Sequence, residues 1–301
     1  MTRQLAHLER LESEAIHILR EGVAEARRPV LLFSGGKDST VLASLAAAAF
    51  HPGRPPLPLL HIDSTFEFPE TLAFRDRLAA DLGFELHVRR NEEGLRRGVS
   101  PFLHGSAAYT DIMRTLPLKA ALDELGADII FGGARRDEEK TRAKERVVSV
   151  RSEGHAWEPR AQRPEIWRQY NTKLGPGQTA RVFPLSNWTE ADIWTYCHAR
   201  QLPLAPLYFA APRPTVSRDG ALLVVADERY PFRPGEQVQV RSVRFRTVGC
   251  WPVTGAIDSE ATTLPQVMRE TLFATTSERQ GRLIDTDDGG SLEAKKRQGY
   301  F

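Results

Sequence analysis

Residues 34–39 read Ser-Gly-Gly-Lys-Asp-Ser and have the composition of a phosphate-binding loop. They follow an apolar run at 30–33 and precede an alanine- and leucine-rich run at 40–50, which predicts a strand, a loop and a helix. A loop entering a helix directs main-chain N–H groups and the positive end of the helix dipole at one point. Glycine lets the backbone approach an anion closely. We interpret six residues as nucleotide-binding, with the lysine also catalytic: Ser34, Gly35, Gly36, Lys37, Asp38 and Ser39.

This loop is not a Walker P-loop. That motif needs a glycine five residues before Gly36, where Leu31 stands. The pattern Ser-Gly-Gly-x-Asp-Ser instead matches the pyrophosphate loop of ATP-cleaving adenylyl transferases. Glycine-rich turns between a strand and a helix are common, but sequence and context together favour phosphate binding.

A basic segment at 132–146 follows another predicted strand and continues at helical spacing. At this spacing Arg135, Arg142 and Arg146 share one face of a helix. Arg135 and Arg136 lie beside the glycine turn, where guanidinium groups can bind tetrahedral oxyanions, and we interpret both as catalytic. The alternative, a solvated helix with i,i+4 ion pairs, applies best to the lysines here. We predict that Lys37→Ala or Arg135→Ala abolishes turnover and leaves the fold intact.

Five residues complete the set of candidates. Asp63 lies at the tip of the second predicted strand, where a carboxylate can meet a nucleoside, although a helix-entry role is nearly as good an explanation. His104 stands next to Gly105, but a lone histidine is more often structural. Arg142, Arg146 and Arg246 complete the candidate substrate-binding set with His104.

Strand-like and helical runs alternate along the first two thirds of the chain. This alternation predicts an α/β fold with a doubly wound, mainly parallel sheet, in which binding residues gather at the carboxyl ends of the strands. Segments 34–39, 63–68, 132–146 and 185–190 fall at such ends. The predicted strands are 30–33, 57–62, 84–88, 128–132 and 181–185, and the predicted helices include 5–23, 70–82, 111–125 and 191–200, the last opened by a capping box at Thr189.

The domain prediction is a nucleotide-binding domain at 1–205 and a C-terminal region at 206–301. The first contains an excursion at 151–178 that lacks a clean period, which we interpret as a surface lid or docking loop. The second is loop-rich, with a few strands, at 221–225 and 237–247, and a short helix. We expect it to pack on the first domain and to contact substrate or a partner.

Composition excludes several classes of protein. The 301 residues carry a net charge of +2, which argues against a surface that coats nucleic acid. Cys197 and Cys250 are the only cysteines, so a disulfide framework, a Cys-x-x-Cys pair and a four-cysteine cluster are excluded. The N-terminus has helical amphipathic spacing rather than a signal peptide's apolar core. We therefore expect a cytoplasmic protein with no membrane segment and no nucleic-acid partner.

Taken together, these segments resemble the small, catalytic subunit of heterodimeric sulfate adenylyltransferase, or ATP sulfurylase. The likeness runs nearly end to end, from the loop at 34–39 to the closing residues 296–301, and the block at 132–146 is its most specific part. The resemblance implies the adenine nucleotide alpha hydrolase-like fold of the pyrophosphate-loop superfamily. Two positions depart from the family: Gly35, where relatives commonly carry a larger apolar residue, and Tyr109, where they carry a second histidine.

The resemblance also implies an activity and a partner. The activity is adenylyl transfer from ATP to sulfate, with Mg²⁺ accompanying ATP, and the partner is a GTPase subunit whose GTP hydrolysis drives the reaction. The sequence does not identify the Mg²⁺ ligands. The alternatives are a phosphoadenylyl-sulfate or adenylyl-sulfate reductase, which needs a nucleophilic cysteine in a mobile tail, and a non-catalytic nucleotide-binding subunit. A tRNA-modifying relative is disfavoured because no zinc or iron–sulfur cysteine set is present.

Overall fold

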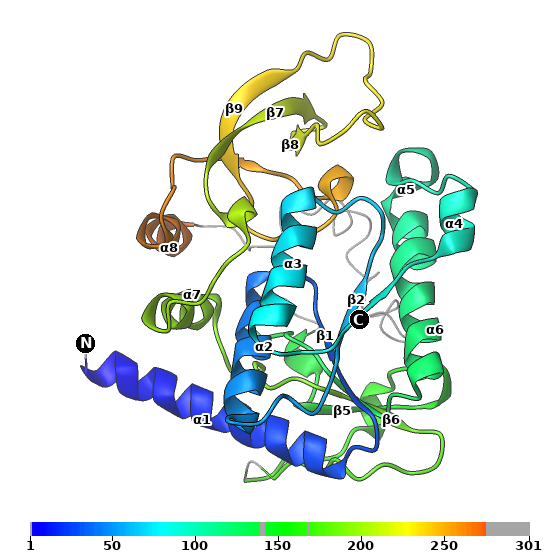
Figure 1. Cartoon of the computed structure of the whole chain (residues 1–301), viewed down its shortest axis with the longest axis vertical. Helices are drawn as coiled ribbons and strands as arrows, with labels where there is room; N and C mark the ends of the chain where they lie inside the picture. Colours follow the sequence, from blue (N-terminus) through cyan, green and yellow to red (C-terminus); the bar gives the residue numbers. More distant parts are fainter. Residues whose placement is uncertain (1, 139–141, 168, 275–301) are drawn as a thin grey trace.

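The computed structural model describes residues 2–138, 142–167 and 169–274 (Figure 1). Its centre is a six-stranded sheet in the order β3-β2-β1-β4-β6-β5, in which all neighbours are parallel except β5 and β6. This confirms the predicted doubly wound, mainly parallel sheet. The strands are β1 (Pro29–Leu32), β2 (Leu59–Ile62), β3 (Leu86–Arg89), β4 (Ile129–Phe131), β5 (Val148–Arg151) and β6 (Thr179–Val182).

Helices cover both faces of this sheet because successive strand side chains point to opposite sides. Leu31 joins the main core, which includes side chains of α1 (Thr2–Glu25) and α2 (Lys37–Phe50). Val30, the preceding residue, packs in a second cluster with α6 (Leu116–Leu125). The remaining helices are α3 (Pro69–Asp81), α4 (Glu92–Arg96), α5 (Pro101–Thr110), α7 (Glu190–Ala199) and α8 (Leu264–Phe273).

Two of the predicted helices show how local signals fix their ends. The capping box of α7 forms as expected, since the Thr189 hydroxyl accepts from the Asp192 amide at 3.1 Å and the Asp192 carboxylate accepts from the Thr189 amide at 2.9 Å. The predicted helix at 111–125 begins differently. Its first residues form a π-helical turn, Asp111–Thr115, between α5 and α6. Such turns are often found at functional sites.

The helix predicted across 132–146 is wrong for the described part of that segment. Residues 132–138 form an irregular turn, and a single 3-10 turn follows at Arg142–Lys144. Helix propensity is a weak prior that tertiary contacts override. Here the override comes from Arg135 and Arg142, whose buried side chains are held by carboxylates. The helix face that Arg135, Arg142 and Arg146 were expected to share therefore does not form.

The edge strand β5 was not predicted, and it changes the interpretation of the excursion at 151–178. Arg151 pairs with β6 and also forms a bridge with Trp157. Trp157 and His155 are buried, so part of the excursion packs against the domain rather than lying on its surface. The first of its short 3-10 turns, Glu153–His155, ends at the buried His155, whereas the second, Pro159–Ala161, has no buried residue.

The C-terminal region contains a second, four-stranded antiparallel sheet in the order β10-β9-β7-β8. Its longest strand, β7, was missed because Pro212 and Pro214 lie in it, and proline usually disfavours a strand. Val225 donates its amide hydrogen to the Pro214 carbonyl oxygen at 2.9 Å, so Pro214 faces away from β9 and its missing N–H breaks no bond to that strand. The strands are β7 (Ala211–Arg218), β8 (Ala221–Val224), β9 (Gln239–Arg244) and β10 (Ile257–Asp258).

The C-terminal region contacts the loop that follows β2. The Trp251 amide donates to the Phe66 carbonyl oxygen at 3.0 Å, and Arg229 donates to the Thr65 carbonyl oxygen at 2.8 Å.

The predicted boundary after residue 205 falls between the two sheets, and the division into domains remains a prediction. The closing segment at 296–301 lies outside the described residues. Within the described part of the chain, no helix is long and apolar enough to cross a membrane.

Candidate active site

The loop between β1 and α2 lies at the carboxyl end of the central strand, as the sequence predicts. Gly36 is the N-cap of α2 and offers no side-chain cap, so main-chain groups begin the helix. The Lys37 amide donates to the hydroxyl oxygen of Tyr208 at 2.7 Å, and the Ser34 and Ser39 hydroxyls lie 3.2 Å apart. Main-chain and hydroxyl donors therefore gather at the start of α2, where the Lys37 amide is bonded to Tyr208.

Two glycines make this arrangement sterically possible. Gly35 has φ +75°, and a Cβ there would lie 2.9 Å from the Thr71 methyl group. Gly133, after β4, packs so closely on Asp38 that a Cβ would lie 3.2 Å from its carbonyl carbon. The loops after β1 and β4 are thus held against each other where the two strands end.

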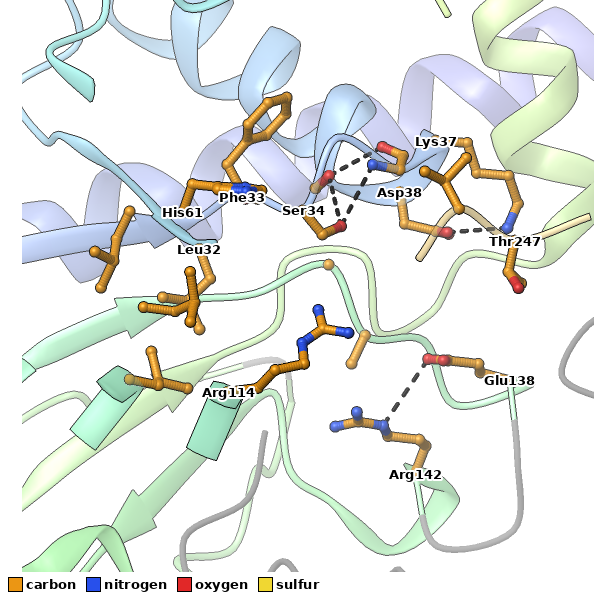
Figure 2. Close-up of a pocket in the computed structure, with 18 of the residues that line it drawn as sticks. Leu32, Phe33, Ser34, Lys37, Asp38, His61, Arg114, Glu138, Arg142 and Thr247 are labelled. Atoms are coloured by element: carbon orange, nitrogen blue, oxygen red, sulfur yellow. Dashed lines mark hydrogen bonds and ion pairs between the residues drawn. The ribbon is translucent and has the colours of Figure 1, made fainter. Parts of the chain in front are cut away.

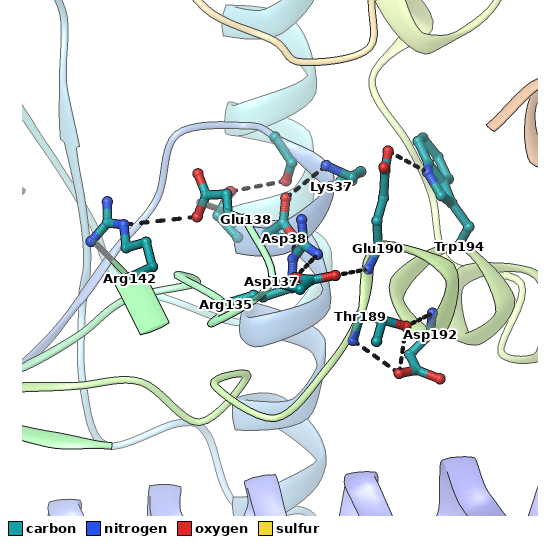
Figure 3. A network of polar contacts seen from close by, with 12 residues as sticks. Lys37, Asp38, Arg135, Asp137, Glu138, Arg142, Thr189, Glu190, Asp192 and Trp194 are labelled. Atoms are coloured by element: carbon teal, nitrogen blue, oxygen red, sulfur yellow. Dashed lines mark hydrogen bonds and ion pairs between the residues drawn. The ribbon is translucent and has the colours of Figure 1, made fainter. Parts of the chain in front are cut away.

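A chain of charged groups links these two loops (Figure 3). Arg135, which is 1% exposed, donates from Nε to Asp38 at 2.7 Å and from Nη1 to Asp137 at 2.8 Å. Lys37 Nζ lies 3.0 Å from the other oxygen of Asp38. Burial alone would raise the pKa of Asp38, but the charges of Arg135 and Lys37 outweigh it and lower the pKa to about 2. Asp38 is therefore ionised at neutral pH.

A cavity of about 230 Å³ opens beside this network, at the carboxyl ends of β1, β2 and β4 (Figure 2). One part of its lining is apolar and another carries charged and hydroxyl groups. The apolar part comprises Leu32, Leu60, Ile62, Leu118 and Val248, and the polar part includes Ser34, Lys37, Asp38, Ser39, His61, Arg114, Thr115, Glu138, Arg142, Tyr208 and Thr247. A site with these two parts suits a ligand that joins a flat apolar group to several negative charges.

Comparisons with known proteins point to one family. Residues 28–256 match the family model of the phosphoadenosine phosphosulfate reductase domain. Sulfate adenylyltransferase subunit 2 of Citrifermentans bemidjiense is 60% identical over 301 residues, which is 100% of both chains. The protein of the same name from Caulobacter vibrioides is 59% identical over 298 residues, 99% of this chain and 96% of its own. The chain belongs to the sulfate adenylyltransferase subunit 2 family.

Among solved structures, this chain has similarity to the phosphoadenylyl-sulfate reductase of Candida auris, determined as a phosphate complex. It is 18% identical, has a TM-score of 0.48 and matches 67% of this chain and 89% of its own.

In this member of the sulfate adenylyltransferase subunit 2 family, several residues predicted for the site do not line the cavity. Arg136 is 37% exposed and bonds to Asn187 at 2.7 Å, and Arg146 is exposed. His104 is exposed on α5, where its ring contacts Ser100. The residue types alone did not show whether these side chains point toward the cavity or away from it.

Asp63 and Arg246 lie near the cavity but act on protein groups. The Asp63 carboxylate accepts from the Thr65 amide at 2.8 Å, which closes a turn in the loop after β2, whereas the N-cap of α3 is Phe68. Arg246 Nη2 pairs with Glu190 at 3.3 Å, while the next residue, Thr247, lines the cavity. Of the predicted arginines, Arg142 lines the cavity, and Arg135 lies behind it.

The structure also brings in residues that sequence reasoning missed. His61, Arg114 and Tyr208 all line the cavity, although they come from β2, the π-helical turn and a short 3-10 turn, Pro206–Tyr208. The position of His61 in β2 was a usable signal, because it lies near the carboxyl end of a strand next to the phosphate loop. Nothing local marks Arg114 or Tyr208.

His61 makes the stability of this protein depend on pH. Burial and the charge of Arg75 lower its pKa to about 4, against an ordinary 6.5. The unfolded chain therefore takes up a proton below pH 6.5 that the folded chain refuses, and stability falls as pH drops from 6.5 toward 4. At pH 5 the expected loss is about 2 kcal/mol relative to pH 7.5.

Urea unfolding of the wild type and His61→Asn at both pH values measures this effect. Asparagine keeps a donor for the Phe33 carbonyl oxygen, which the His61 ring contacts at 2.9 Å. The variant should lose less stability than the wild type between the two pH values. Burial also lowers the pKa of His155. This histidine is present in both proteins, so its effect on stability cancels in the comparison. Equal losses would contradict the assignment to His61.

Proposed function

We propose that this chain transfers the adenylyl group of ATP to sulfate, giving adenosine 5′-phosphosulfate and pyrophosphate. Full-length identity of 60% to a protein named sulfate adenylyltransferase subunit 2 supports the proposal. The observation that carries it structurally is the cavity, which joins the glycine loop with Lys37 to a basic side chain, Arg142, and to an apolar wall. ATP and sulfate require these three features together.

The reaction needs no base. Sulfate is fully ionised at neutral pH, so one of its oxygens attacks the α-phosphorus of ATP directly. A new bond forms between this sulfate oxygen and the α-phosphorus, which gives an S–O–P linkage. The bond from the α-phosphorus to the oxygen that bridges it to the β-phosphorus breaks, and that oxygen leaves with the electron pair as part of pyrophosphate. Because two anions must meet, catalysis rests on positioning and on neutralising charge.

Each part of the cavity has a role in this proposal. The triphosphate lies at the loop 34–39, where main-chain donors and Lys37 hold the departing pyrophosphate. The adenine base occupies the apolar part near Leu60 and Leu118. Arg142, which is 7% exposed and paired with Glu145 at 3.2 Å, faces the cavity and draws in an oxyanion.

Arg135 has a positioning role in this proposal. Its guanidinium is buried between Asp38 and Asp137, so it holds Asp38 and, through it, Lys37. Arg136 stays a predicted catalytic residue, and Arg146, Arg246 and His104 stay predicted substrate-binding residues. Arg246 directly precedes Thr247, which lines the cavity.

Mg²⁺ is expected to enter with ATP rather than to reside in the protein. Among the described residues, no group of three or more His, Cys, Asp or Glu could hold a metal ion. Mg²⁺ in nucleotide sites usually takes one or two carboxylates and completes its shell with phosphates and water. Asp38 and Glu138 are the carboxylates that line the cavity, and because Arg135 and Lys37 engage both oxygens of Asp38, Glu138 is the residue that would hold it. When bound, Mg²⁺ neutralises charge on the phosphates.

We further propose a GTPase subunit as partner. The name of the relatives, subunit 2, implies a second subunit. The Walker P-loop is missing from this sequence, so GTP hydrolysis is assigned to that partner. The test is sulfate-dependent release of pyrophosphate from ATP by the purified chain, with and without the GTPase subunit and GTP. Release that requires sulfate supports the proposal, and its absence with all components present favours a non-catalytic nucleotide-binding subunit.

A reductase is the less favoured function. It would need an accessible nucleophilic cysteine, whereas Cys250 is 1% exposed and burial raises its pKa. Cys197 is fully buried, and its pKa is raised to about 12. Both thiols are therefore protonated and shielded. Thioredoxin-dependent release of sulfite from the purified chain would reverse this ranking.

A further inference from the structure

Arg114 is a cationic side chain of the cavity that the predicted site does not include. It extends from the π-helical turn Asp111–Thr115 toward the middle of the cavity, between the loop of Ser34 and the pair Glu138–Arg142 (Figure 2). A π-helical turn shifts the side chains that follow it around the helix axis, and such turns recur at functional sites. The turn thus explains how a helix that packs on the sheet can also aim a guanidinium into the cavity.

A buried polar cluster lies behind Arg114. Glu67 accepts from the amide of Ser64 at 3.0 Å and from its hydroxyl at 2.6 Å, and the Ser64 hydroxyl lies 2.8 Å from the Cys250 sulfur. Tyr109 donates to the Ser64 carbonyl oxygen at 2.8 Å. A β-bridge joins Glu67 to Cys250. The loop after β2 and the C-terminal region are thereby fixed to each other beside Arg114.

The charges in this cluster help to hold the Arg114 guanidinium in one position. Burial raises the pKa of Glu67, and the positive charge of Arg114 opposes that rise, so the two groups interact. Arg114 Nη1 also donates to the Cys250 sulfur at 3.8 Å. Sulfur is a weak acceptor, and exchanging this long contact for an oxyanion costs little.

We propose that Arg114 binds an oxyanion of the reacting pair, either sulfate or the α-phosphoryl group, and that Glu67 is its positioning residue. This inference rests on the proposed adenylyl transfer and adds a cation on the wall opposite Lys37. A guanidinium there reduces the repulsion between the two anions as they approach. It also gives the C-terminal region a role at the site, because Cys250 belongs to it.

The test compares Arg114→Gln and Arg114→Lys with Arg96→Gln in sulfate-dependent pyrophosphate release. Arg96 is an exposed arginine paired with Glu93 on α4, so its substitution controls for the loss of one positive charge. Arg114→Gln should lower kcat/KM by about 10²- to 10³-fold, with a smaller loss in the lysine variant. A raised KM for sulfate with an unchanged KM for ATP identifies sulfate as the ligand. A lowered kcat with both KM values unchanged identifies the α-phosphoryl group. Activity of Arg114→Gln within about twofold of the wild type overturns the proposal.

Two further measurements separate binding from a structural role. Free guanidinium should partly restore the activity of Arg114→Ala, which it would not do if the side chain only supported the fold. Glu67→Gln keeps an acceptor for Ser64 but removes the negative charge, so it should change the same kinetic constant as Arg114→Gln. The double variant should be no worse than Arg114→Gln alone, and additive losses would contradict the role of Glu67. An inactive wild type would instead overturn the proposed function together with this inference.

Discussion

Lys37→Ala is expected to slow sulfate-dependent pyrophosphate release by about 10²- to 10³-fold, which corresponds to a loss of about 3 to 4 kcal/mol of transition-state stabilisation. Lys37 is the first residue of α2, is 1% exposed and lines the cavity. Its ammonium lies 5.8 Å from the ring centre of Trp194 and 3.0 Å from Asp38, so it is preorganised before substrate binds. The alanine variant lacks this ammonium, so the charge that develops on the departing pyrophosphate is less stabilised.

The measurement is kcat at saturating ATP and sulfate for purified Lys37→Ala, with Lys173→Ala as control. Lys173 is an exposed lysine of the excursion and should retain the activity of the wild type. Urea unfolding of both variants shows whether either has lost its fold. Turnover of folded Lys37→Ala close to that of the wild type would remove the lysine from the site.

Arg135→Ala is expected to lower the free energy of unfolding by about 3 to 5 kcal/mol, because it leaves buried charge without its partner. Arg135 is 1% exposed and bonds both Asp38 and Asp137. The sequence alone predicted an intact fold for this variant, whereas the burial of the side chain leads us to expect a less stable one. We also expect activity to fall, because Asp38 and Lys37 lose a common anchor.

Urea unfolding at pH 7.5 measures this effect, with Arg136→Ala as the matched control for stability. Arg136 is the next residue in the chain but is 37% exposed, so its substitution should change the free energy of unfolding by no more than about 0.5 kcal/mol. Arg135→Met keeps the apolar stem without the charge and should remain less stable than the wild type. Equal stability of the Arg135 and Arg136 variants would contradict the role of the buried ion pairs.

The predictable features are those that depend on residues close in sequence. The phosphate loop follows from glycines and a lysine between a strand and a helix, and the capping box of α7 from two residues three positions apart. The parallel sheet follows from the alternation of strands and helices. Strand β7 was missed because it depends on residues far apart in sequence. Its prolines, Pro212 and Pro214, are tolerated because of the side toward which their missing N–H groups face, and this side is set by the pairing with β8 and β9.

The direction of long side chains could not be predicted. Arg135 and Arg136 are adjacent and chemically alike, yet one is buried against Asp38 and the other bonds Asn187 on the surface. What separates them is where the carboxylates of distant elements lie, and no local pattern carries that information.

The amino-acid sequence by itself determined the class of fold, the nucleotide loop at 34–39 and the family resemblance, because each depends on residue types at short, fixed spacings. The tertiary structure decided which cations face the cavity. Arg114 enters it through a π-helical turn, and Tyr208 reaches the Lys37 amide from another part of the chain. These placements follow from packing between elements far apart in sequence, where burial requires each charge to find a partner.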